Sequence, residues 1–142
     1  MAATRTASAH WEGTLFEGSG KVSLDSSGVG TYDVSWPART EEPHGKTSPE
    51  ELIAAAHASC FSMAFSNGLA KNGTPATSLD TTAAVTFVPG TGITTSALSV
   101  VGVVEGVTPE QFADLAAAAK AGCPVSNALA GNVEITIEAK LA

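Results

Sequence analysis

The chain has 142 residues, a length that suits one domain, residues 1–142, with enough apolar content to bury a core without disulfides. Its formal net charge of −7 argues against a nucleic-acid-binding surface and predicts a solvated acidic exterior. The N-terminal residues lack an apolar signal core, and the most apolar run, residues 52–65, is interrupted by polar side chains and has the wrong length for a membrane span, so we expect a cytoplasmic protein with no membrane partner.

Three antiparallel strands are predicted in the first part of the chain. Polar and apolar residues alternate roughly over residues 4–12 and 21–24, and the glycines between these runs favour a β-hairpin. After a second turn, Tyr32, Val34 and Trp36 alternate with polar residues. This period of two predicts a third strand with an aromatic-rich buried face.

A polar connection follows, over residues 37–47, and its length and lack of apolar side chains predict a loop. It carries Arg39, one of only two arginines in the chain. One interpretation is that Arg39 pairs with Glu41 or Glu42 on the surface. The other is that it supplies a guanidinium to a functional site.

The strongest helix signal lies over residues 48–73. Ser48, Pro49 and Glu51 have the pattern of an N-cap, a first helical residue and the glutamate of a capping box, and an Asn-Gly pair ends the segment. A helix of roughly 23 residues would be about 35 Å long, which is unusual for a chain of this size. We expect a buried central helix with Cys60 near its middle.

The second half of the chain predicts two strands, over residues 81–88 and 94–105, and the second is apolar enough to lie inside a sheet. A helix over residues 108–122, a short helical turn over residues 123–129 and a strand over residues 133–138 follow. This order predicts an α+β fold with helices packed on an antiparallel sheet.

The two cysteines have different local environments. Cys60 lies in the middle of a helix, where nothing local lowers its pKa from about 8.5, so a nucleophilic role would need a cation such as Arg39. The alternative is an inert apolar residue in a helical core. Cys123 is expected at the cap of the short helix, where exposed amides favour a thiolate. Local electrostatics therefore predicts Cys123 as the more acidic thiol.

Two further side chains on the central helix could belong to a site. Glu50 is not needed for capping, but about 15 Å of helix separates it from Cys60, so both could share a site only if two such helices packed antiparallel across a two-fold axis. Function would then require a dimer. His57, one turn before Cys60, could be a base or half of a metal site; a core or pocket-lining histidine is the better interpretation, because no CxxC motif accompanies it.

The stretch SPEELIAAAHASCFSMAF together with CPVSNAL resembles the OsmC/Ohr family of thiol-dependent organic hydroperoxide reductases. The resemblance covers nearly the whole chain, including the N-terminal HWEG strand. It implies antiparallel sheets packed on a long central helix, and an intertwined homodimer with active sites at its interface. It also implies a cysteine-based peroxidase for oxidative and osmotic stress defence, which reduces organic hydroperoxides to alcohols and hydrogen peroxide less well.

The same resemblance assigns roles to individual residues. Cys60 corresponds to the peroxidatic cysteine, Cys123 to the resolving cysteine, and Glu50 to the glutamate that partners an activating arginine, here Arg39. Residues 15–24 contain no arginine, which resembles the OsmC subgroup rather than the Ohr subgroup. The implied cycle needs no metal or bound cofactor, only an external thiol reductant, either a small dithiol or a thiol protein.

Phe61, Met63 and Phe65 are predicted to give the reactive cysteine an apolar surround that favours organic substrates. A competing hypothesis is a non-catalytic dimer on the same scaffold, which binds a ligand or serves a structural role under stress and has two inert cysteines.

Overall fold

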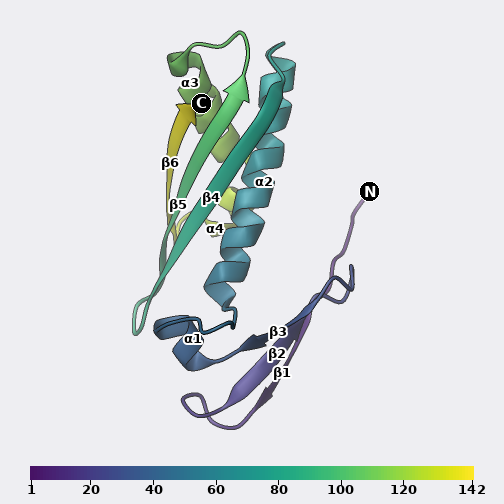
Figure 1. Cartoon of the computed structure of the whole chain (residues 1–142), viewed down its shortest axis with the longest axis vertical. Coiled ribbons are helices and arrows are strands. Elements are labelled where there is room, and N and C mark those ends of the chain that lie inside the picture. Colours follow the sequence, from purple (N-terminus) through teal and green to yellow (C-terminus); the bar gives the residue numbers. More distant parts are fainter. The chain divides into compact units, whose positions relative to one another are not determined.

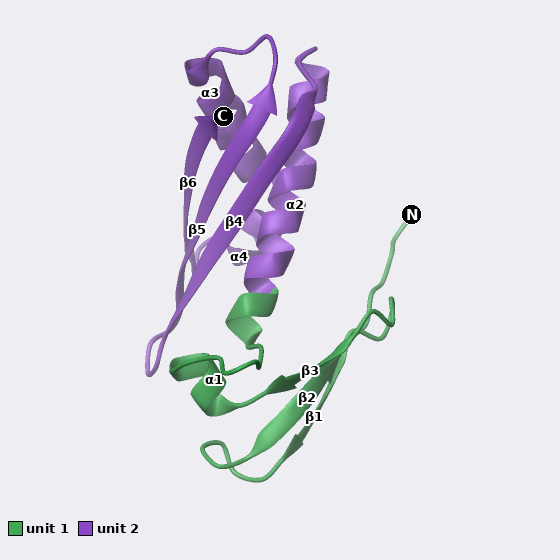
Figure 2. Ribbon diagram, in the orientation of Figure 1, with its two compact units in different colours: residues 1–52 green, residues 53–142 purple.

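The computed structural model describes all residues, 1–142, and its element order is βββααββααβ (Figure 1). The elements are β1 (Ser8–Glu12), β2 (Ser19–Ser23), β3 (Thr31–Val34), α1 (Trp36–Thr40), α2 (Pro49–Lys71), β4 (Ala76–Val88), β5 (Gly92–Val104), α3 (Pro109–Gly122), α4 (Pro124–Leu129) and β6 (Glu134–Leu141). They form two compact units, Met1–Leu52 and Ile53–Ala142 (Figure 2).

The first unit contains the predicted antiparallel sheet, in the order β1-β2-β3. Its register places Trp11 opposite Gly20, and a Cβ on Gly20 would lie 2.8 Å from the Trp11 ring, so only glycine fits there. The predicted aromatic-rich buried face of β3 is wrong. Tyr32 is 42% exposed, and the strand ends at Val34, before Trp36 starts a helix.

The loop predicted over residues 37–47 begins instead with the short helix α1. Ser35 is its N-cap, and the Ser35 hydroxyl accepts a hydrogen bond from the Ala38 N–H at 3.2 Å. Pro37 supplies a fixed backbone angle in the first turn. These local signals turn the chain from strand to helix and place Arg39 in the last turn of α1.

Helix α2 has 23 residues and confirms the predicted central helix. The Ser48 hydroxyl accepts a hydrogen bond from the Glu51 N–H at 3.2 Å, but the Glu51 carboxylate takes the Thr47 hydroxyl rather than closing a capping box. Gly73 follows the helix in the left-handed conformation, with φ at +79°, as the predicted stop requires.

The second unit is built on a sheet with the strand order β4-β5-β6. β4 pairs antiparallel with β5, whereas β5 pairs parallel with β6, so the expectation of purely antiparallel sheets is wrong in this detail. The chain between β5 and β6 includes α3 and α4, and a helical crossover of this kind is what parallel pairing needs. The central place of β5 confirms that it lies inside the sheet.

Helices α2 and α3 lie on the sheet of this unit (Figure 1), and side chains from all three form its core. Phe65 of α2 and Phe112 of α3 are fully buried, with ring centroids 4.9 Å apart. Gly102 of β5 leaves room for Phe112, because a Cβ there would lie 2.6 Å from the ring. The buried cluster comprises Phe61, Phe65, Leu69, Leu98, Val100, Phe112, Ala116, Ala119 and Cys123.

The other face of α2 is exposed, so the expectation of a buried central helix holds for one face only in the single chain. Ala55, Ala56 and Ser59 are exposed, and Met63 is 72% exposed. Although residues 52–65 have the wrong length for a span, α2 as a whole is long and apolar enough to cross a membrane. That is weak evidence by length and composition only, because core helices of soluble proteins meet the same criterion.

Phe65→Ala is expected to lower the free energy of unfolding by about 3–5 kcal/mol, because the lost ring leaves a cavity between α2 and α3. Guanidinium unfolding followed by circular dichroism measures this change. Phe16→Ala, the same substitution at a position that is 67% exposed, is the control and should cost far less. Equal losses at the two positions would contradict the assigned core.

Candidate functional site

In the first unit, Arg39 of α1 and Glu50 in the first turn of α2 form an ion pair. Arg39 Nη2 donates to Glu50 Oε2 at 2.8 Å, and Arg39 Nε lies 3.0 Å from Oε1 and 3.1 Å from Oε2. Two nitrogens of a planar guanidinium on one carboxylate fix the orientation of both groups. The interpretation of Arg39 as a surface partner of Glu41 or Glu42 is therefore wrong.

This pair is well shielded from water. The Glu50 side chain is 9% exposed and the Arg39 side chain 27%. The Arg39 guanidinium carbon also lies 5.9 Å from the Trp36 ring centroid, within the range of a cation–π contact. Partial burial weakens screening by solvent, so the geometry holds a positive charge in a defined place.

An apolar cavity of about 270 Å³ lies beside Arg39 within the same unit. Its walls come from the three-stranded sheet, α1 and the start of α2, and Arg39 is the only charged residue among them. A cavity with apolar walls and one cation suits a small apolar molecule that carries a polar or anionic group. Its lining residues are Ala9, Trp11, Leu15, Val22, Val34, Ser35, Trp36, Arg39, Pro49 and Leu52.

In the second unit, the two cysteines lie together as reduced thiols. Cys60 is on α2 and partly exposed, whereas Cys123 is fully buried at the N-cap of α4, the cap position predicted for it. The two thiols lie close enough to shift each other's pKa, because Cys123 raises the pKa of Cys60 and Cys60 lowers that of Cys123. A cysteine that solvent can reach therefore contacts one that solvent cannot reach.

The surroundings shift the two thiols in opposite directions. Burial raises the pKa of Cys60, and the neighbouring Cys123 thiol raises it further, although the Val125 N–H opposes both effects. Burial also raises the pKa of Cys123, but donors at the start of α4, chiefly the N–H and hydroxyl of Ser126, outweigh it and lower this pKa overall. This agrees with the prediction that local electrostatics favours a thiolate at Cys123.

His57 is fully buried and confirms the interpretation of a core histidine. Its Nδ1 lies 2.6 Å from the Ser96 hydroxyl on β5, and its Nε2 lies 2.7 Å from the Ser126 hydroxyl on α4. The structure shows no group of three or more His, Cys, Asp or Glu side chains that could hold a metal ion. Sequence reasoning missed both serines, because a serine has no spacing or flanking pattern that marks it as a partner.

Burial lowers the pKa of His57, so stability should fall as the pH drops. Between the lowered folded-state pKa and the unfolded value of about 6.5, the unfolded chain binds more protons than the folded chain. In this range the free energy of unfolding changes by up to about 1.4 kcal/mol per pH unit. Urea unfolding at pH 7.5 and pH 5 measures it. His57→Gln should reduce the pH dependence, whereas replacement of the exposed His10 should not; an unchanged slope in His57→Gln would contradict the assignment.

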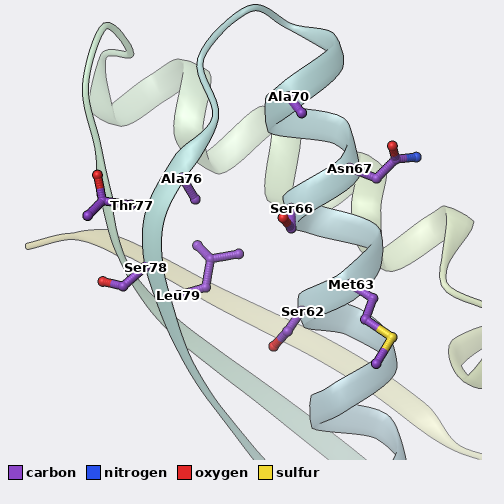
Figure 3. Close-up of a pocket in the computed structure, with 9 residues that line it drawn as sticks. All are labelled: Ser62, Met63, Ser66, Asn67, Ala70, Ala76, Thr77, Ser78 and Leu79. Atoms are coloured by element: carbon purple, nitrogen blue, oxygen red, sulfur yellow. The ribbon is translucent and has the colours of Figure 1, made fainter.

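A second hollow, of about 620 Å³, lies between α2 and the start of β4 (Figure 3). Figure 3 shows Ser62 and Ser66 on α2 beside residues 76–79, with Met63 on the outer side of the helix. None of the four predicted site residues lines it. Cys60 packs against the cluster that contains Phe61 and Phe65, which agrees with the predicted apolar surround. Both rings are fully buried and offer no surface to a substrate in the single chain, whereas Met63 is 72% exposed.

The profile of the family described as OsmC-like protein matches residues 42–138. Peroxiredoxin OsmC of Escherichia coli (strain K12) is 43% identical over 136 residues, which cover 94% of this chain and 93% of that protein. Among solved structures, the organic hydroperoxide resistance protein OhrB of Bacillus subtilis is 25% identical, with 95% of this chain and 98% of that chain covered and a TM-score of 0.72. An organic hydroperoxide resistance protein OsmC from Legionella pneumophila is also 25% identical, with 98% and 99% covered and a TM-score of 0.71.

Proposed function

Because this chain belongs to the OsmC-like family, whose members are thiol peroxidases of hydroperoxide resistance, we propose that it reduces organic hydroperoxides to alcohols through Cys60 and Cys123. The peroxidase class follows from the family. The roles of single residues are inferred from their surroundings. The observation that carries the proposal is the contact between a partly exposed thiol and a fully buried one.

Cys60 is the peroxidatic cysteine in this proposal, because a peroxide can reach it and cannot reach the buried Cys123 without rearrangement. The Cys60 thiolate attacks one oxygen of the O–O bond, the alcohol leaves, and a sulfenic acid remains on Cys60. Cys123 condenses with it, releasing water and forming a disulfide. An external dithiol or thiol protein then restores both thiols by exchange, without a prosthetic cofactor.

Arg39 activates the thiol in this scheme. The surroundings of Cys60 in its own unit raise its pKa, so attack at neutral pH needs a cation from elsewhere. Arg39 would stabilise the thiolate and the developing oxyanion, and Glu50 would hold Arg39 in place through its bidentate contact. The apolar cavity beside Arg39 supports a substrate with an organic tail, in preference to hydrogen peroxide.

The complete site requires a homodimer. Glu50 and Cys60 are ten residues apart on the continuous helix α2, which is about 15 Å of helical rise. Two α2 helices packed antiparallel across a two-fold axis would bring Arg39 and Glu50 of each chain to Cys60 of the other. The exposed small residues of α2 and Met63 supply a surface for this packing.

We propose that the 142 residues act as one domain in a cytoplasmic protein for oxidative and osmotic stress defence. The acidic net charge of −7 supports a protein that does not bind nucleic acid. In the dimer, the apolar face of α2 faces its partner copy rather than a lipid bilayer.

Cys123→Ser is expected to retain the first chemical step and lose the disulfide. With cumene hydroperoxide, Cys60 should accumulate as a sulfenic acid that dimedone traps, whereas the wild type should lose two thiols per chain. Mass spectrometry of the trapped protein measures both outcomes. If the wild type consumes no peroxide with any dithiol and loses no thiols, the non-catalytic dimer is the better description.

A further inference from the structure

A buried chain of polar side chains connects three elements of the second unit and ends at Cys123. Ser96 of β5 and His57 of α2 are fully buried, and Ser126 of α4 is 4% exposed. The His57 ring lies between the two hydroxyls, 2.6 Å from one and 2.7 Å from the other. Cys123 is the N-cap of α4 and Ser126 lies one turn further along that helix, and the N–H and hydroxyl of Ser126 lower the pKa of the Cys123 thiol. The order is therefore Ser96, His57, Ser126, Cys123.

The two possible hydrogen arrangements of this chain have different consequences. A neutral imidazole carries one N–H and one acceptor nitrogen. If Nδ1 carries the hydrogen and donates to Ser96, Nε2 accepts the hydroxyl hydrogen of Ser126, which leaves Ser126 to accept from a Cys123 thiol. If Nε2 carries the hydrogen and donates to Ser126, the Ser126 hydroxyl can donate to a Cys123 thiolate. The tautomer of the His57 ring thus depends on whether Cys123 is a thiol or a thiolate.

We infer that His57 is a positioning residue for Cys123. His57 acts through the Ser126 hydroxyl and favours the thiolate form of Cys123, which then attacks the oxidised Cys60. The inference rests on the proposed function, in which Cys123 condenses with the oxidised Cys60. It gives the buried histidine a part in the second chemical step and none in the first.

The proposed step is balanced in atoms and protons. The Cys123 thiol passes its proton to Ser126 Oγ while Ser126 passes its hydroxyl hydrogen to His57 Nε2, which gives a thiolate and an imidazolium. The thiolate attacks the sulfur of the Cys60 sulfenic acid, the S–S bond forms and the S–O bond breaks. The released hydroxide takes the Ser126 hydroxyl hydrogen, His57 Nε2 returns its proton to Ser126 Oγ, and the hydroxide leaves as water. Because burial disfavours the imidazolium, the return of the proton is favourable.

The neighbours of His57 indicate that the hydrogen-bonded series Ser96, His57 and Ser126 acts on the Cys123 thiol. Two neutral hydroxyls face the His57 nitrogens, and no charged group contributes to the lowered pKa of His57. Cys60 is the titratable side chain that acts on Cys123. A purely structural link between α2 and the sheet already exists at Ser62, whose hydroxyl lies 2.7 Å from that of Thr81. Ser62 therefore offers a matched control.

The kinetic test follows one oxidation in Ser126→Ala, His57→Gln and the control Ser62→Ala. One equivalent of cumene hydroperoxide is added, and quenched samples are analysed for sulfenic acid and disulfide. Ser126→Ala and His57→Gln should form the sulfenic acid at the wild-type rate but convert it to the disulfide on the order of 10-fold more slowly at pH 6–7. The defect should vanish at a pH where Cys123 ionises unaided. An unchanged rate of disulfide formation, or a slowing that is equal at every pH, would overturn the inference.

A second measurement is independent of peroxidase activity. In a Cys60→Ser background, thiolate absorbance reports the titration of Cys123 alone, and Ser126→Ala and His57→Gln should each raise its midpoint while Ser62→Ala should not. Nitrogen NMR of the His57 ring should show the tautomer change at the same midpoint. If the wild type forms no sulfenic acid, the proposed function fails. This titration still decides whether His57 and Ser126 act on the ionisation of Cys123. A Cys123 midpoint that is unmoved in both variants would overturn it.

Discussion

Cys60→Ser is expected to abolish peroxide reduction, with a loss of at least about 10³-fold in kcat/KM. A serine hydroxyl does not ionise near neutral pH and attacks the O–O bond poorly, so no sulfenic intermediate can form. Consumption of cumene hydroperoxide with a dithiol reductant, at a fixed reductant concentration, measures the loss. Substrate protection of Cys60 against alkylation provides a second readout of the same thiol.

The matched variant is Cys123→Ser, which keeps the accessible thiol and removes the buried one. It should show one rapid oxidation per chain and little turnover. The opposite pattern, with activity kept in Cys60→Ser and lost in Cys123→Ser, would show that Cys123 attacks the peroxide. That outcome would agree with the lowered pKa of Cys123. The experiment therefore decides whether solvent exposure or a low pKa determines which cysteine attacks the peroxide.

Helix α2 was predictable because its signals are local. Ser48 caps the first turn, Pro49 begins the helix, and Gly73 accepts the left-handed conformation after its end. Each of these effects depends on neighbours within four residues, so no tertiary knowledge is needed. The capping box of α3, with Thr108 and Gln111, was predictable for the same reason.

Two features that sequence reasoning missed have different causes, one local and one that depends on distant parts of the chain. The alternation of Tyr32, Val34 and Trp36 predicts one strand, but the Ser35 cap and the proline in the first turn of α1 end that strand early. The parallel pairing of β5 with β6 is set by the crossover through two helices. A period of two is the same for both pairing directions, so the pattern of β6 could not reveal it.

Some contacts of the candidate site could be predicted from the sequence and others could not. The pairing of Arg39 with Glu50 was implied by the family resemblance, whereas charge counting alone allowed Glu41 and Glu42 equally. The contacts of His57 with Ser96 and Ser126 span 39 and 69 residues. No local pattern encodes a contact of that separation.

Arg39→Ala is expected to lower kcat/KM for cumene hydroperoxide at pH 7 by on the order of 10²-fold. About 20-fold of this would come from a smaller thiolate fraction, if the guanidinium lowers the Cys60 pKa by ~2 units, and the rest from lost stabilisation of the oxyanion. The loss that comes from the smaller thiolate fraction should disappear as the pH rises and Cys60 ionises unaided. The loss that comes from the missing oxyanion stabilisation should remain at every pH. Arg5→Ala, at the other arginine, should have no effect. Arg39→Lys should recover little, because an ammonium cannot make the bidentate contact with Glu50.

Two inactive variants can then locate the arginine relative to the thiol it serves. Arg39→Ala and Cys60→Ser carry different tags and are co-expressed, and two-step purification isolates the heterodimer. If Arg39 serves Cys60 of the partner subunit, one of the two sites in each heterodimer combines an intact Arg39 with an intact Cys60, so about half of the wild-type activity should return. If both residues act within one chain, neither site is intact and the heterodimer stays inactive. Recovery would therefore establish the shared site, whereas its absence in a heterodimer of correct mass would reject the two-fold arrangement and place Arg39 and Cys60 in one subunit.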